Sequence, residues 1–116
     1  MSAIVRHESK GILSSAVEYG DTVYLAGLTA DDQSKDAKDQ AAEILAKIDR
    51  LLAVCGSNKS KVLTATIWVS DIRNRATMNE AWNAWTGGEN LPGRACIEAK
   101  LADPRLLVEI AVVAAK

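Results

Sequence analysis

The stretch from Leu106 to Ala115, LLVEIAVVAA, is apolar at nearly every position and carries a single charge, at Glu109. Branched and small apolar residues dominate it, which is typical of a strand buried in a sheet. A carboxylate in such a run must find partners or give up its charge, because burial of an unpaired charge is costly. Glu109 is therefore the first candidate functional residue.

The segment just before this run predicts a second strand that pairs with it. Residues 94–101 (RACIEAKL) alternate in polarity, and Ala-Asp-Pro at 102–104 is a turn-forming cluster that suits a hairpin. In the register that this turn favours, Cys96 lies opposite Glu109, and Arg94 lies one diagonal step away, at about 7–8 Å. A slip of one residue would place these side chains on different faces. We therefore expect a guanidinium, a thiol and a carboxylate to gather on one sheet face.

This grouping predicts a site for a small organic acid. The guanidinium of Arg94 can bind a carboxylate through two parallel hydrogen bonds, and Glu109 can act as a base beside it. Spacing alone also fits a structural ion pair, which is the commoner role of an Arg and a Glu on adjacent strands. The position of Arg94, directly after the glycine-rich segment 87–93, favours a functional site, because sites are often assembled where loops meet strand ends.

The rest of the chain predicts further strands and two helices. The N-terminal part predicts a short strand at Ile4–Val5, a loop or strand over 11–18, a hairpin turn at Gly20-Asp21 and a strand over 22–26. After it we expect a helix capped by Ser34 and ending near Cys55-Gly56, a central strand over 62–69 and a helix over 75–85. The first helix carries its apolar residues at three- and four-residue steps, at Ala37, Ala41, Ile44, Leu45, Ile48, Leu51 and Leu52.

With the two C-terminal strands, the expected order is β-β-β-α-β-α-β-β. It indicates one α+β domain, residues 1–116, with both helices on one face of a mixed or antiparallel sheet.

Composition limits the function classes. The 14 basic and 15 acidic residues are well mixed and give a net charge of −1, so the chain lacks the basic stripe that nucleic-acid binding needs. No apolar run reaches the ~20 residues of a membrane span, and the N-terminus resembles no export signal. Two cysteines are too few for a disulfide scaffold. We expect a cytoplasmic protein with no membrane and no nucleic-acid partner.

Other chemically active side chains have simpler interpretations. His7 is the only histidine, so a metal site built on it is not expected, and we place it at the surface. Cys55 is interpreted as a small buried residue of the first helix. Trp82 and Trp85 are spaced for packing against the sheet, although stacking on a flat ligand is the alternative. Arg73 lies in a basic loop that is solvated by default or rims an anion site.

Three segments resemble the RidA family, also called YjgF/YER057c/UK114. PGRACIEAKLADPRLLVEIAVVAA at 92–115 is similar to the family's C-terminal Pro-x-Arg-x-Cys and Val-Glu-Ile strands. GDTVYLAG at 20–27 is similar to its Gly-Asp-x-Val-x-x-Ser-Gly pattern, and VSDIRNRATMNEAW at 69–82 is similar to its strand-to-helix passage. The likeness extends over nearly the whole chain.

The resemblance implies a chorismate-mutase-like α+β fold, a homotrimer with clefts between subunits, and hydrolysis of reactive 2-iminoacids and enamines to 2-oxoacids and ammonia. It implies no metal and no organic cofactor. Arg94 would hold the substrate carboxylate, Glu109 would position or activate water, and Cys96 would line the site. Gly27 and Arg73 would complete the substrate-binding set.

The chain departs from the family pattern at two positions. Leu13 stands where active members commonly carry a tyrosine, and Ala26 stands where they often carry a serine. Non-catalytic binding or sensing of a small carboxylate metabolite is therefore an alternative, and an interaction or chaperone-like trimer is a third. The sequence leaves open which iminoacid is used and whether Glu109 is protonated. The segment WNAW at 82–85 predicts a distinct tryptophan-rich subgroup.

Overall fold

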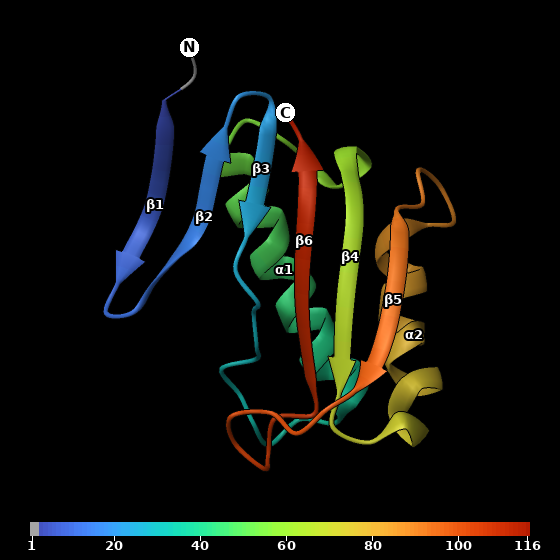
Figure 1. Cartoon of the computed structure of the whole chain (residues 1–116). Coiled ribbons are helices and arrows are strands. Elements are labelled where there is room, and N and C mark those ends of the chain that lie inside the picture. The colour runs from blue at the N-terminus through green and yellow to red at the C-terminus, as the bar shows by residue number, and fades with distance from the viewer. Residues whose placement is uncertain (1–2) are drawn as a thin grey trace.

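The computed structural model describes residues 3–116, which form one six-stranded sheet and two α-helices (Figure 1). The elements are β1 (Ile4–Lys10), β2 (Leu13–Tyr19), β3 (Thr22–Leu25), α1 (Ala37–Val54), β4 (Val62–Val69), α2 (Arg75–Thr86), β5 (Gly93–Glu98) and β6 (Val108–Ala115), with short 3-10 turns η1 (Lys59–Lys61) and η2 (Ile72–Asn74). The predicted order β-β-β-α-β-α-β-β is confirmed. So is the mixed sheet, because β4 and β5 are parallel and the other neighbours are antiparallel.

Both helices cover the same face of the sheet, as predicted, and the core lies between them and the strands (Figure 1). Along β6 every second residue is buried: Val108, Ile110, Val112 and Ala114. The apolar positions predicted for α1 are all buried too, and α2 adds Met78 and Trp82 to this core. The buried residues that recur every two positions in the strand and about every 3.6 positions in the helix thus pack together in one apolar layer.

The N-cap of helix α1 lies two residues after the predicted cap at Ser34. Its N-cap is Asp36, whose carboxylate accepts a hydrogen bond from the Asp39 amide at 2.8 Å. Ser34 instead donates to the Asp32 carboxylate through both its hydroxyl and its amide. The prediction of Ser34 was therefore wrong, because two cap-forming residues compete in this segment and only Asp36 stands where the first free amides need an acceptor.

The predicted C-terminal hairpin is also wrong. In the sheet order β1-β2-β3-β6-β4-β5, the strand β4 lies between β5 and β6. Cys96 is therefore aligned with Ile67 of β4, and Ile67 in turn with Ile110, so Cys96 does not face Glu109. The physical reason is that α2 connects β4 to β5 as a crossover, which places those two strands in parallel contact and leaves the other edge of β4 for β6.

The second face of the sheet, opposite the helices, is here called the open face. Strand alternation and register place Glu109, Ala111 and Val113 of β6 on it, along with the cross-strand neighbours of Glu109. Several large apolar side chains on this face are about half exposed: Ile4, Leu13, Tyr19, Tyr24 and Ile97. An apolar surface of this kind is typical of a protein-protein contact.

Two further sequence predictions have clear outcomes. The turn at Gly20-Asp21 is confirmed, because Tyr19 pairs with Thr22 and Gly20 has a φ of 61°. The first strand is longer than predicted, since β1 continues to Lys10 with an irregularity at Glu8, where φ is 51°. Within the described residues, no helix has the length and apolar character that crossing a membrane requires.

Candidate functional site

Glu109 and Gly27 lie in contact on the open face. A two-way backbone bridge joins Leu28 to Ile110: the Leu28 amide donates to the Ile110 carbonyl at 2.9 Å, and the Ile110 amide donates to the Leu28 carbonyl at 3.1 Å. In the antiparallel register of this bridge Gly27 lies opposite Ala111, so Gly27 and Glu109 are diagonal neighbours across it. A β-carbon added to Gly27 would collide with Oε2 of Glu109 and would lie 3.1 Å from its Cδ. The glycine thus provides the space that the carboxylate fills.

Glu109 lies between an apolar neighbour on β4 and the segment that carries Gly27. Glu109 is half-buried, and its cross-strand neighbour on β4 is Trp68, which is aligned in turn with the exposed Ile97 of β5. Trp68 was not singled out from the sequence. Its signal was its place in VLTATIWV, since it has the opposite parity to the buried Ile67 and Val69.

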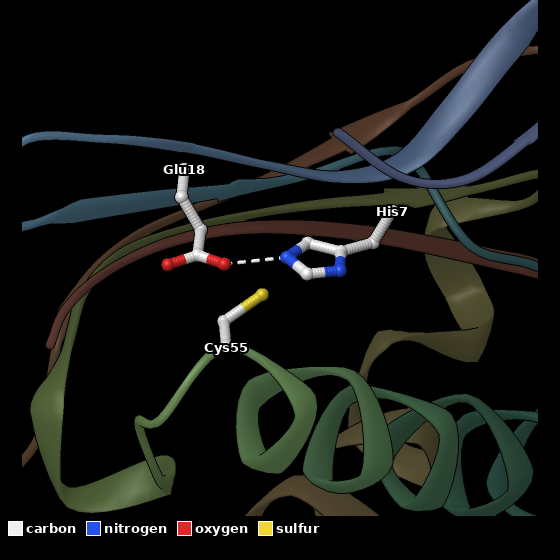
Figure 2. Close-up of side chains that lie close together, drawn as sticks. All are labelled: His7, Glu18 and Cys55. Atoms are coloured by element: carbon white, nitrogen blue, oxygen red, sulfur yellow. Dashed lines mark hydrogen bonds and ion pairs between the residues drawn. The ribbon is translucent and has the colours of Figure 1, made fainter. Parts of the chain in front are cut away.

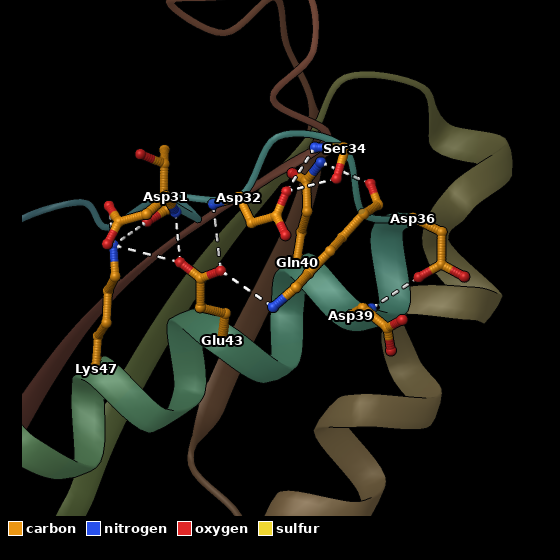
Figure 3. A network of polar contacts seen from close by, with 10 residues as sticks. Asp31, Asp32, Ser34, Asp36, Asp39, Gln40, Glu43 and Lys47 are labelled. Carbon is orange, nitrogen blue, oxygen red and sulfur yellow. Dashed lines mark hydrogen bonds and ion pairs between the residues drawn. The ribbon is translucent and has the colours of Figure 1, made fainter.

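The loop that carries Gly27 is fixed by a polar network on α1 (Figure 3). The Glu43 carboxylate accepts hydrogen bonds from the amides of Asp31 and Asp32. Lys47 donates to the Thr29 carbonyl at 2.7 Å and pairs with the Asp31 carboxylate at 2.9 Å. Backbone hydrogen bonds to Glu43 keep the pKa of its carboxyl below the usual 4.5, with Asp31 as the largest cause. The helix therefore sets the position of the loop opposite Glu109.

A buried glutamine fixes the start of β6 in the same way. Gln40 is fully buried, and its amide group donates to the carbonyls of Lys35 and Arg105, both at 3.0 Å. Its side-chain oxygen accepts a hydrogen bond from the Leu107 amide at 2.9 Å. Leu107 is two residues before Glu109. One side chain therefore joins the segment before α1 to the strand that carries the candidate base.

Arg94 lies away from this position. Its side chain is exposed at the edge strand β5, where Nη1 donates to Oδ1 of Asn79 at 2.7 Å and the guanidinium carbon lies 5.2 Å from the centre of the Trp82 ring. Asn79 and Trp82 belong to α2, so the side chain of Arg94 turns toward the helix-covered face. The predicted grouping of Arg94, Cys96 and Glu109 on one face of one chain is therefore wrong.

Cys96 and Arg73 have different surroundings. Cys96 is half-buried against the core, on the same face as Arg94. Arg73 is exposed and pairs with Asp71 at 2.6 Å, and its hydrogen bonds lower the pKa of that carboxyl to about 2. Arg73 lines a shallow hollow of about 530 Å³ at the ends of β4 and β5, together with Glu98 and Lys100. Because Asp71 neutralises it, Arg73 presents little free charge to an anion.

The two positions that depart from the family pattern both lie near the open face. Leu13 is half exposed and lines a hollow of about 570 Å³ over the β1–β2 turn. Ala26 follows β3, and its amide donates to the Ser15 carbonyl at 3.0 Å. Neither side chain supplies a hydroxyl, so any polar contact to a ligand at these positions comes from the backbone.

Comparison with known proteins agrees with this architecture. A model of the family described as Endoribonuclease L-PSP matches residues 4–116. The RutC family protein YoaB of Escherichia coli is 40% identical over 112 residues, which cover 97% of each chain. A RutC family protein of Haemophilus ducreyi is 38% identical over 112 residues, covering 97% of this chain and 96% of the relative.

Solved structures show the same similarity in three dimensions. The crystal structure of a YjgF family member from Neisseria meningitidis has a TM-score of 0.95 at 39% identity and covers 98% of this chain and 95% of that chain. A member of the YjgF/YER057c/UK114 family from Mycobacterium tuberculosis has a TM-score of 0.89 at 26% identity, covering 98% of this chain and 100% of that one.

The mixed sheet with both helices on one face and a half-open second face defines the YjgF-like class of α+β proteins. The chain belongs to the RidA/YjgF/L-PSP family, and it is similar to its RutC family proteins over nearly its whole length.

Proposed function

We propose that this protein hydrolyses reactive 2-iminoacids and enamines to 2-oxoacids and ammonia, at a site between the subunits of a homotrimer. The observation that carries the proposal is the carboxylate of Glu109 held against Gly27 on the open face. The family includes imine deaminases, which favours this reaction over others that a lone carboxylate can support.

The placement of the charges supports a site shared between two subunits. Glu109 and Gly27 lie on the open face, whereas Arg94 is exposed on the outermost strand β5. The open face carries half-exposed apolar side chains, and the family is typically trimeric. Docking of the open face against a neighbouring subunit brings Arg94 of the partner subunit to the cleft beside Glu109. Arg94 leaves Asn79 and binds the substrate carboxylate instead.

The chemistry needs no cofactor, because the imine carbon is already electrophilic. Glu109 accepts a proton from water as the water oxygen bonds to that carbon, and the C=N electron pair passes to nitrogen, which takes up a proton. In the resulting carbinolamine the amino nitrogen takes the proton that Glu109 holds, the hydroxyl group loses its proton, and the C–N bond breaks with its electron pair on nitrogen, which releases ammonia and leaves the 2-oxoacid. Proton transfer of this kind contributes roughly 10²–10⁴-fold, and the orientation of substrate and water adds to it.

A direct assay tests the proposal. Freshly generated 2-iminopropionate is mixed with the protein, and release of ammonia and pyruvate is compared with the uncatalysed rate. We expect acceleration by the wild type and a slower rate with Glu109→Gln, while pyruvate raises the melting temperature of both. Because the matching family is described as an endoribonuclease, an RNA substrate is tested in parallel. We expect no cleavage, because the chain has no basic stripe.

The same assay decides the alternative of non-catalytic binding or sensing, which the apolar residues Leu13 and Ala26 favour. Stabilisation by pyruvate or another 2-oxoacid without any acceleration would replace the enzyme proposal with the binding one, since a ligand that binds the folded state must raise its stability. Absence of both effects would remove both proposals.

A further inference from the structure

Three side chains that have different origins in the sequence converge on the helix-covered face. His7 comes from β1, Glu18 from β2 and Cys55 from the C-cap of α1. Nε2 of His7 contacts Oε2 of Glu18, and the nitrogen, oxygen and sulfur atoms all lie within 4.8 Å of one another. Figure 2 shows the Cys55 sulfur directed at the space beside the contact between the imidazole and the carboxylate.

The structure corrects one sequence prediction here and confirms another in part. His7 was placed at the surface, but it is half-buried, with 22% of its side chain exposed. Cys55 was interpreted only as a small core residue, and it is indeed 4% exposed, but its sulfur faces two metal-ligating groups. The sequence hid the cluster because its members are 11 and 37 residues apart and no short spacing marks them.

We propose that His7, Glu18 and Cys55 form a binding site for a divalent transition-metal ion, with zinc as the best-fitting metal. Imidazole nitrogen, thiolate sulfur and carboxylate oxygen are the three ligand types that zinc takes in proteins. A sulfur ligand disfavours magnesium and calcium, which prefer oxygen alone. The direct contact between His7 and Glu18 opens as the ion enters between them.

Charge supports this choice of ion. When the Cys55 sulfur binds the metal, its proton passes to solvent, so the site offers one thiolate and one carboxylate with a neutral imidazole. Those two negative charges favour a cation, and the ion pair with Lys116 neutralises part of the Glu18 charge, so the bound ion keeps a net positive charge that a hydroxide or another anion at an open ligand position can offset. Lys116 pairs with Oε1 of Glu18, the oxygen that does not contact His7, so it fixes the carboxylate without occupying the ligand atom. Outer contacts of this kind are typical of metal sites.

Three protein ligands leave a fourth tetrahedral position for water, and the partial exposure of His7 gives solvent access to it. The ion would join the β1–β2 hairpin at the sheet edge to the end of α1. The site is distinct from that of Glu109, because the buried Val23 pairs with Glu18 and places it on the opposite sheet face. The proposal therefore does not depend on the deaminase activity.

Metal binding to the full chain provides the test. Purified protein is stripped with chelator, dialysed against Zn²⁺ and analysed for bound metal, and Co²⁺ is added in parallel to record the absorption of a cobalt–thiolate bond in the near ultraviolet. Variants are His7→Asn and Cys55→Ser, with Cys96→Ser as the matched control because it removes the other thiol. His7 lies on the edge strand β1, so we expect His7→Asn to fold. It therefore keeps the test valid if Cys55→Ser folds poorly.

We expect about one zinc ion per chain, a cobalt–thiolate band, and a higher melting temperature with zinc in the wild type and in Cys96→Ser. His7→Asn and Cys55→Ser should weaken binding by at least the roughly 10–100-fold that even outer contacts contribute. A wild type that binds zinc no more tightly than His7→Asn, or that gives no cobalt–thiolate band, would overturn the proposal.

Discussion

The carboxylate of Glu109 lies against the α-carbon of Gly27, in space that any larger residue at position 27 would fill. Gly27 is exposed and Glu109 is half-buried, so the contact lies at the surface of the open face rather than in the core. The bridge between Leu28 and Ile110 fixes this contact through the backbone. A candidate base is thus held in place by main-chain structure on both sides.

Gly27→Ala should displace the Glu109 carboxylate and lower imine hydrolysis, while the protein stays folded. The new methyl group meets the flexible end of a side chain at a surface position, so we expect a loss of stability of about 1 kcal/mol or less and a fall of at least ~10-fold in kcat. Gly93→Ala is the matched control, because a β-carbon there has ordinary contacts at 3.7 Å and beyond. Equal activity in both variants would contradict the role of Gly27.

Arg94→Ala should remove the anchor for the substrate carboxylate. We expect kcat/KM on 2-iminopropionate to fall at least ~100-fold with the trimer intact, because the contacts that Arg94 makes to Asn79 and Trp82 are at the surface and contribute under about 1 kcal/mol. Arg75→Ala, an exposed arginine at the start of α2, is the control and should keep its activity. An unchanged rate in Arg94→Ala would remove the anchor role.

Gln40→Leu should destabilise the fold more than its size suggests. The substitution leaves two carbonyls and one amide, all part-buried, without their partner, which should lower the free energy of unfolding by about 2–4 kcal/mol in urea denaturation. Lys38→Leu, an exposed position on the same helix, is the control. A loss below about 1 kcal/mol would show that water replaces these hydrogen bonds.

Acid should weaken the attachment of the Gly27 loop through Glu43. Its pKa is lowered in the folded protein, so its stabilising contribution is fully present above the usual value of 4.5 and is lost as pH falls below 4.5 through the lowered pKa. The difference in unfolding free energy between wild type and Glu43→Gln should therefore shrink over that range. A difference that is constant with pH would rule out this contribution of Glu43.

The sequence predicted the positions of the helices and strands better than it predicted which strands pair with one another. Strand β4 and helix α1 agree closely with their predicted extents, because β4 is apolar or β-branched almost throughout and α1 carries its apolar residues at three- and four-residue steps. The pairing of β5 with β6 failed because Ala-Asp-Pro at 102–104 looks like a hairpin turn. The better signal was the helix between β4 and β5, since a strand-helix-strand unit favours parallel pairing.

The candidate site was predicted only in part, because its residues show in local patterns but its contacts depend on which strands pair. Glu109 could be singled out as the lone charge in an apolar strand, and Gly27 entered through the family resemblance. Their contact depends on the isolated bridge from Leu28 to Ile110, which spans 82 residues of sequence and leaves no local pattern. Arg94 was placed on the wrong face relative to Glu109 because that inference depended on the incorrect hairpin.

The most direct measurement of the central claim is a mixing experiment with Arg94→Ala and Glu109→Gln subunits, each of which is strongly impaired alone. If Glu109 of one subunit works with Arg94 of the next around a threefold ring, every mixed trimer contains one intact site of three. Co-refolding the two variants in equal amounts should then restore about a quarter of the wild-type imine hydrolysis. A mixture no more active than its separate components would contradict a site shared between subunits.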